Sequence, residues 1–173
     1  SASAVTKWIN PQDFFSQHQV AVNHPDRLFN SNDIGAKEFT LTFTIPKDWE
    51  AEYIPARKAI NLFSLSGTGT ARSRSQMYIS FFDANQFQTL TTVNVLSTKD
   101  LQVGQGAYTT KRYEIEKKTN VATFADQPSW RNTKHIVTDL RAKEGQTRYF
   151  AFAKNPDLDE STYQQVLASI KLN

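Results

Sequence analysis

Short segments that alternate apolar and polar residues recur along this chain, and they constrain its fold more than any other feature. In the clearest one, residues 39–45 (FTLTFTI), phenylalanine, leucine and isoleucine share one side and the threonines share the other. A period of two residues is typical of a β-strand with one buried face. Pro46 lacks a backbone N–H and ends the ladder, so we expect a half-buried strand before Trp49.

Further segments follow the same pattern and are joined by links of hairpin length. Because consecutive strands with short links pair antiparallel, the sequence predicts an antiparallel sheet of roughly six strands. Residues 87–98 suit either a strand or a short helix. The remaining expected strands are 59–67, 76–83, 105–118, 134–142 and 147–155.

One convincing helix is expected, near the C-terminal end. Asp157 suits an N-cap, and Glu160 three residues later completes a capping-box pattern. From Tyr163 to Ile170, apolar residues recur at i, i+3, i+4 and i+7, which forms one stripe. No second long amphipathic helix is available, so the stripe must cover a sheet. The expected class is α+β, an antiparallel β-sheet with helices packed on its faces.

The length of 173 residues suits one domain with an additional N-terminal segment. We expect residues 1–36 to form an irregular segment or tether and residues 37–173 to form the domain. The opening SASA is small and polar, as a tether left by a removed leader would be, and also as a cloning sequence would be. A lipid anchor upstream of Ser1 would fit the first reading.

Composition excludes several kinds of protein. The chain has no cysteine, which rules out disulfides and thiolate zinc sites. Its formal charge of +3 is spread along the chain and forms no nucleic-acid footprint. No run of 18 apolar residues exists, so no membrane-spanning segment is expected.

The histidines give no metal motif. His24 and Asp26 lie close in sequence, but a site built on them would need a third ligand from elsewhere. His135 and Asp139 fall on the same side of an expected strand with different neighbours, which does not establish an acid–base pair. We expect no metal and no cofactor.

Motifs for phosphate binding and nucleophilic catalysis are also missing. The GTGT at residues 67–70 lacks the P-loop lysine and opens no convincing helix. No G-x-S-x-G elbow is present. The sequence therefore predicts no catalytic residues and a protein that is not an enzyme.

Two loops carry candidate partner-binding residues. Arg72 and Arg74 make a small cationic loop, which can equally be a solvated one. Trp130 and Arg131 follow a proline, and an exposed tryptophan beside an arginine is typical of an interface anchor. A tryptophan in that position can instead cap the core.

Two motifs resemble those of one family. FTLTFTIPKDW (39–49) resembles the opening strand of PsbP-like domains, and RYFAFAKNPDLDESTYQQVLASIKLN (148–173) resembles their closing strand and helix. The resemblance covers about residues 37–173 and implies an α/β/α sandwich around an antiparallel sheet. Members of the family include non-catalytic extrinsic subunits of photosystem II, which modulate its ions, and exported bacterial domains, some of them lipoproteins.

The chain has no equivalent of the long basic N-terminal segment of the photosynthetic members, and no ion-binding residue matches. We therefore expect a non-catalytic, monomeric bacterial accessory module that is exported or membrane-tethered. Its expected location is periplasmic, lumenal or at the cell surface. It would contact a protein partner of the envelope or of a membrane complex through loops such as 66–75 and 124–134. The alternative is a small-molecule or metal-ion binding protein with a pocket between sheet and helix.

Overall fold

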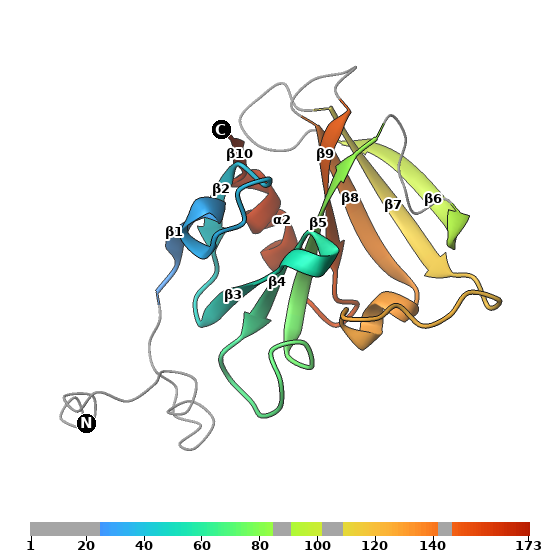
Figure 1. The fold of residues 1–173 in the computed structure, drawn as a ribbon, viewed down its shortest axis with the longest axis horizontal. Coiled ribbons are helices and arrows are strands. Elements are labelled where there is room, and N and C mark those ends of the chain that lie inside the picture. The colour runs from blue at the N-terminus through green and yellow to red at the C-terminus, as the bar shows by residue number, and fades with distance from the viewer. Residues whose placement is uncertain (1–24, 85–90, 102–108, 142–146) are drawn as a thin grey trace.

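The larger part of the structure is a seven-stranded antiparallel sheet (Figure 1). The computed structural model describes residues 25–84, 91–101, 109–141 and 147–173. The strand order in the sheet is β3-β4-β5-β9-β8-β7-β6. The strands are β3 (Trp49–Ile54), β4 (Ala59–Ser64), β5 (Ser75–Asp83), β6 (Val93–Leu101), β7 (Thr109–Lys117), β8 (His135–Arg141) and β9 (Arg148–Lys154).

A second, three-stranded sheet and one α-helix cover one face of the larger sheet. The small sheet has the order β1-β2-β10, formed by β1 (Arg27–Asn30), β2 (Leu41–Ile45) and β10 (Lys171–Leu172). Helix α2 (Glu160–Ala168) runs beside β2, and the Thr44 N–H donates to Ser169 Oγ just after the helix. Three short 3₁₀ helices link the strands: η2 (Ser31–Ile34), η3 (Pro55–Arg57) and η5 (Ser129–Asn132).

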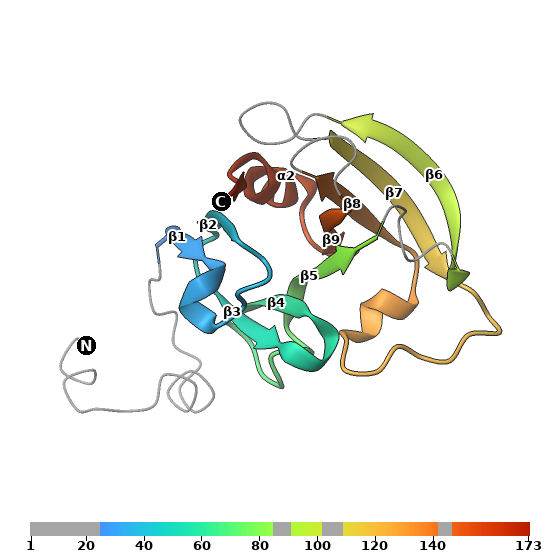
Figure 2. The same ribbon diagram turned by 45° about the horizontal axis from the view of Figure 1, so that its top comes forward.

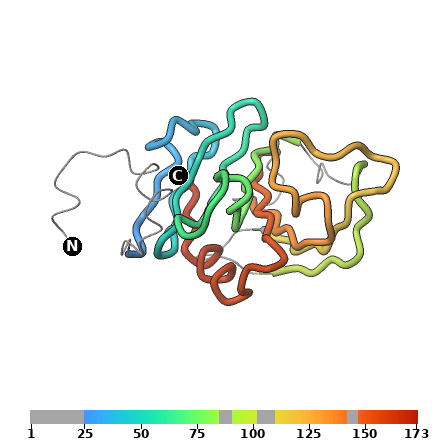
Figure 3. The backbone as a smooth tube through the Cα atoms, turned by 90° about the horizontal axis from the view of Figure 1, so that it is seen from below, coloured from blue at the N-terminus to red at the C-terminus, as the bar shows by residue number. Residues whose placement is uncertain are grey.

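The α+β class with helices on the sheet faces, and with it the α/β/α sandwich, is wrong. The described residues contain one α-helix and are mostly β, in two antiparallel sheets. The chain offers a single amphipathic stripe, and the small sheet supplies the rest of the covering layer. The connection 118–134, which contains η5, lies on the other side of the molecule from α2 (Figure 3).

The main core lies between the larger sheet and this covering layer. Phe43 of β2 and Phe152 of β9 are both fully buried in it. Thr42 and Thr44, which alternate with the buried residues of β2, are half-buried. The alternation expected for residues 39–45 is therefore confirmed within β2. A second apolar cluster occupies the opposite face of the larger sheet, around Tyr78 and Tyr149.

The larger sheet is curved, which shapes this second face. Figure 2 shows β7 and β6 arching away from β5. Alternation along β5 sends Met77 and Ile79 to the main core and Tyr78 and Phe82 to the second face. The second face is therefore the inner side of an arch, with β5 as its floor.

Helix α2 has the expected stripe but a later start. Its N-cap is Asp159, whose carboxylate accepts from the Thr162 N–H at 3.2 Å, so the expected cap at Asp157 is wrong. Tyr163, Val166 and Leu167 are buried, and so is Ile170 just beyond the helix. The apolar stripe is thus confirmed in full.

Tyr163 ties the helix to the sheet through its hydroxyl. It donates to the Phe152 carbonyl at 2.6 Å and lies 2.6 Å from Thr138 Oγ1. We expect Tyr163→Phe to lower the free energy of unfolding by about 1–3 kcal/mol, because buried polar groups lose their partner. Urea unfolding measures this, with Gln164→Ala on the exposed side of α2 as the control. A loss no larger than that of the control would contradict the prediction.

Three strands were not expected from the sequence. β1 lies in a stretch rich in Asn, Asp and Pro, within the segment expected to be irregular, yet Phe29 is buried in the main core. β3 is an edge strand with two glutamates, and it pairs with β4. β10 has only two residues. No helix in the part of the chain described here is long and apolar enough to cross a membrane.

Candidate functional site

The second face of the larger sheet holds a cavity of about 280 Å³. Its floor is β5, and the connection before β8 covers it. Thr92, just before β6, also lines it, although β6 lies four strands from β5 in the sheet order. The curvature of the sheet thus brings Thr92 to the site. We call this cavity the arginine pocket, and its lining residues are Arg57, Tyr78, Ser80, Phe82, Thr92, Phe124, Gln127 and Arg131.

The local sequence fixes the cover of this pocket. Pro128 precedes η5, and Thr133 closes it with its N–H and its hydroxyl both donating to the Trp130 carbonyl. The Asn132 side chain accepts from the Phe124 N–H at 2.9 Å. These bonds hold Arg131 just before β8, with its side chain turned into the protein.

Arg131 is a buried cation with neutral partners. Only 6% of the residue is exposed. Its Nε donates to Gln127 Oε1 at 3.1 Å, and its Nη1 lies 2.7 Å from His135 Nε2. The rings of Tyr78 and Phe124 lie 5.8 and 5.9 Å from the guanidinium carbon. Within the described ranges, no carboxylate forms an ion pair with it.

Burial lowers the pKa of Arg131 to about 10, and nearby Tyr78 opposes this shift. The guanidinium therefore stays charged at neutral pH in a site that disfavours charge. Such a group is costly for the fold unless an anion joins it.

His135 accepts from Arg131 in its neutral form. Its Nδ1 lies 2.7 Å from the Thr133 carbonyl, which can only accept, so Nδ1 carries the proton and Nε2 accepts. Burial, followed by repulsion from Arg131, lowers the pKa of His135 to about 3. The Trp130 ring packs edge-on against it, with 5.4 Å between ring centroids. Both ring nitrogens of His135 are thus engaged in hydrogen bonds, Nδ1 with the Thr133 carbonyl and Nε2 with Arg131.

More arginines surround Tyr78. Arg57 and Arg72 both face Asp126, at 3.9 and 3.7 Å, and Arg72 also lies 3.4 Å from Glu52. Burial raises the pKa of Tyr78 to about 12 although three arginines lower it, so its hydroxyl stays protonated. The described residues that line the pocket include two guanidinium groups and no carboxylate.

The structure gathers three of the four expected partner-binding residues near this pocket. Arg131 lines it, Trp130 packs against His135 behind it, and Arg72 joins its rim through Asp126. Arg74 lies apart: its guanidinium stacks over Phe63 at 5.4 Å and donates to the Ser64 carbonyl. The assignment of all four as partner-binding residues stays a prediction.

Sequence reasoning missed Arg57 and Tyr78, and it considered His135 only as the partner of Asp139 in an acid–base pair. Arg57 lies in a 3₁₀ helix that had no recognisable pattern, and Tyr78 looked like ordinary strand core. The only local signal was the charged and aromatic pair at Trp130 and Arg131. It indicated an exposed anchor, whereas Arg131 is buried.

Asp139 is a second buried charge on the same face, farther along β8. Its Oδ2 lies 3.7 Å from Arg141 Nη2, and its Oδ1 has no hydrogen-bond partner within the part of the chain that the structure describes. Burial raises the pKa of Asp139 to about 6, although Arg141 and Lys111 lower it. Four residues along a strand correspond to about 13 Å, so Asp139 and His135 do not form an acid–base pair.

We expect Asp139→Asn to stabilise the protein at pH 8 by about 2 kcal/mol. The folded-state pKa lies above that of the unfolded chain, so folding favours the protonated form. Stability is therefore lost as pH rises from about 4 to 6 and stays low above that range. Chemical unfolding at pH 8 and pH 4 measures this. A variant as pH-dependent as the native chain between pH 4 and 6 would contradict the expectation.

A metal site at His24 and Asp26 gains no support. His24 lies outside the described residues, and Asp26 Oδ1 accepts from the Lys47 N–H at 2.6 Å. No group of three or more His, Cys, Asp or Glu side chains that could hold a metal ion occurs within the described ranges.

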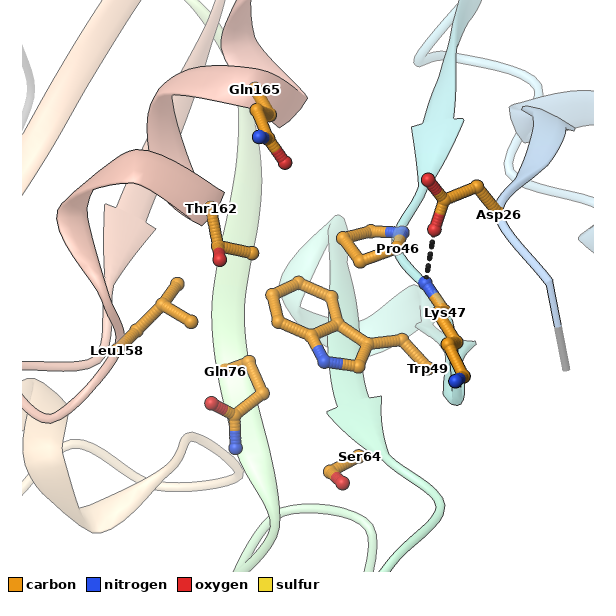
Figure 4. Close-up of a pocket in the computed structure, with 9 residues that line it drawn as sticks. All are labelled: Asp26, Pro46, Lys47, Trp49, Ser64, Gln76, Leu158, Thr162 and Gln165. Carbon is orange, nitrogen blue, oxygen red and sulfur yellow. Dashed lines mark hydrogen bonds between the residues drawn. The ribbon is translucent and has the colours of Figure 1, made fainter. Parts of the chain in front are cut away.

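A second cavity, of about 380 Å³, lies between α2 and the sheets, where the sequence alternative expected a pocket (Figure 4). Figure 4 shows the Trp49 ring in its centre, with Pro46 on one side and Leu158 on another. The charged groups of its lining, Asp26 and Lys47, have opposite signs, and Asp26 is exposed. This cavity therefore defines a ligand less sharply than the arginine pocket does.

No protein family, curated protein or solved structure matches this chain. The resemblance to PsbP-like domains therefore rests on the sequence alone, through the two quoted motifs and the expected order of the strands.

Proposed function

We propose that this chain is a non-catalytic binding module that holds an anionic group of its ligand in the arginine pocket. The observation that carries the proposal is the burial of Arg131 among neutral partners. Among the described residues, Arg131 uses two of its five N–H donors, on Gln127 and His135. The rest can form charge-assisted bonds to an anion, which are stronger in a site with little water.

Binding fits the site better than catalysis does. A general acid or base needs a pKa near the working pH. The pKa of His135 is about 3 and that of Tyr78 about 12, so neither group exchanges protons near neutral pH. The ring nitrogens of His135 are also engaged by Arg131 and Thr133.

The two loops expected to bind a partner contribute to the same site. Loop 66–75 supplies Arg72 and loop 124–134 supplies Asp126 and Arg131. We therefore keep these loops as the binding region, with a ligand that inserts a small anionic group. Export to an extracytoplasmic location is part of the proposal and is supported by the sequence resemblance. A genomic sequence upstream of Ser1 without a signal peptide or lipobox would contradict export.

Thermal unfolding in different sodium salts tests the proposal. At constant ionic strength, replacing chloride by acetate, phosphate or benzoate should raise the melting temperature in at least one case, because a ligand of the native state stabilises it. The rise should disappear in Arg131→Met. Arg148→Met is the matched control, because Arg148 is exposed and stacks over Phe81, on the other face of the sheet. An equal rise in all three proteins would contradict the proposal.

A further inference from the structure

We infer that the ligand of the arginine pocket is a compact aromatic carboxylate. This inference rests on the proposed function and adds the chemical class of the ligand. It follows from the pocket walls, its size and the geometry of the donors that Arg131 leaves unused.

The walls are aromatic on several sides. Tyr78 and Phe82 come from β5 and Phe124 from the connection before β8. Phe82 is half-buried and stacks on Tyr149, with 5.1 Å between ring centroids and 22° between ring planes. A flat ligand body can continue this stack inside the pocket. Aromatic pairs add favourable energy beyond the area they bury.

The size of the cavity limits the ligand. At about 280 Å³ it lies at the small end of the usual range for ligand pockets. One ring and one charged group fill such a space, whereas a nucleotide does not.

The donors favour a planar monoanion. The Nε edge of Arg131 is taken by Gln127, and one Nη1 hydrogen is taken by His135. Among the described residues this leaves one Nη1 hydrogen and the Nη2 group without a hydrogen-bond partner, and two N–H groups of a guanidinium can bind the two oxygens of a carboxylate in one plane. Arg57 is the only other cation among the described lining residues, and 42% of its side chain is exposed. One buried cation balances one negative charge, so a phosphate dianion would remain undercompensated.

Isothermal titration with four probes tests the inference. Benzoate should bind more tightly than acetate. Benzamide, its neutral counterpart, should bind about 30-fold or more weakly than benzoate, since it leaves the buried cation unpaired. Cyclohexanecarboxylate, which keeps the charge and the bulk without the ring electrons, should bind about 3–10-fold more weakly than benzoate.

Two leucine variants locate the aromatic contact. Phe82→Leu should lower the affinity for benzoate by a similar factor, about 3–10-fold, and leave the affinity for acetate unchanged. Phe81→Leu is the matched control, because Phe81 is the next residue along β5 and packs into the main core on the opposite face. It should leave benzoate binding unchanged.

The outcomes separate this inference from the proposed function. If acetate binds as tightly as benzoate and Arg131→Met abolishes the binding of both, the anion site stands and the aromatic class is wrong. If no probe binds in an Arg131-dependent way, both are wrong. If benzoate binds equally well to Phe82→Leu and to the native chain, the aromatic wall is assigned to the wrong residue and the inference fails.

Discussion

Arg131→Met is expected to abolish anion binding while the protein keeps or gains stability. Truncating one partner of a buried, hydrogen-bonded charge pair typically costs about 2–5 kcal/mol of binding free energy. That corresponds to a loss of affinity between about 30-fold and several thousand-fold. The anion would face a methionine in place of its only buried cation.

The stability of this variant is the more telling result. The lowered pKa of Arg131 means that its charge costs the folded protein about 3 kcal/mol relative to the unfolded chain. Methionine has a similar length and no charge, and such replacements of buried ions are often neutral or stabilising. The loss of the hydrogen bond to His135 offsets part of this gain. We expect a net gain of up to about 2 kcal/mol in urea unfolding.

If the role of Arg131 is structural, and it mainly holds η5 in place, the methionine variant is expected to be less stable than the native chain in the absence of any anion. Arg131→Lys provides a second measure, because it keeps the charge and loses the flat fork. For binding, we expect the lysine variant to lie between the native chain and the methionine variant. An affinity for anions that is equal in all three would contradict the site.

The sequence predicted the strands better than the layers. Alternation is a local property, so β2, β5, β8 and β9 were visible, and so was the stripe of α2. The pairing of Arg27–Asn30 with β2 was not visible, because four residues among turn-forming neighbours acquire strand structure only through that pairing. The edge strand β3 was missed although Trp49, Ala51 and Tyr53 alternate with two glutamates, because this short stretch lies between Pro46 and Pro55 and was expected to be irregular. Without β1 and β10, the small covering sheet could not be recognised, and its layer was assigned to helices.

The site was predictable only in part. Trp130 and Arg131 stood out by composition, and two of the expected loops do meet at the pocket. The sequence could not show that the Arg131 side chain is buried. The burial of Arg131 depends on the curvature of a seven-stranded sheet and on residues as distant as Arg57 and Thr92, which lie far from it along the chain.

The other large effect expected is a loss of stability in acid caused by His135. The pKa of His135 is about 3 in the folded protein, against an ordinary value of 6.5. Between these values the unfolded chain binds a proton that the folded protein rejects. This contribution to stability is therefore complete above pH 6.5 and is lost as pH falls below it. By pH 4 the loss amounts to about 3 kcal/mol.

His135→Gln removes this loss, because glutamine cannot take up the proton and still offers an oxygen near the position of Nε2. In the native chain the effect is partly hidden. Asp139 has a raised pKa, so its contribution increases as pH falls from 6 to 4, opposite in sign to that of His135. The stability of the native chain should thus change little with pH in this range.

The His135→Gln variant should gain stability on acidification, and the Asp139→Asn variant should lose stability. Urea unfolding of the three proteins at pH 7, 6, 5 and 4 measures both slopes. Parallel curves for the native chain and His135→Gln would show that His135 is not the buried neutral acceptor of Arg131, and the charge balance on which the arginine pocket depends would have to be reassigned.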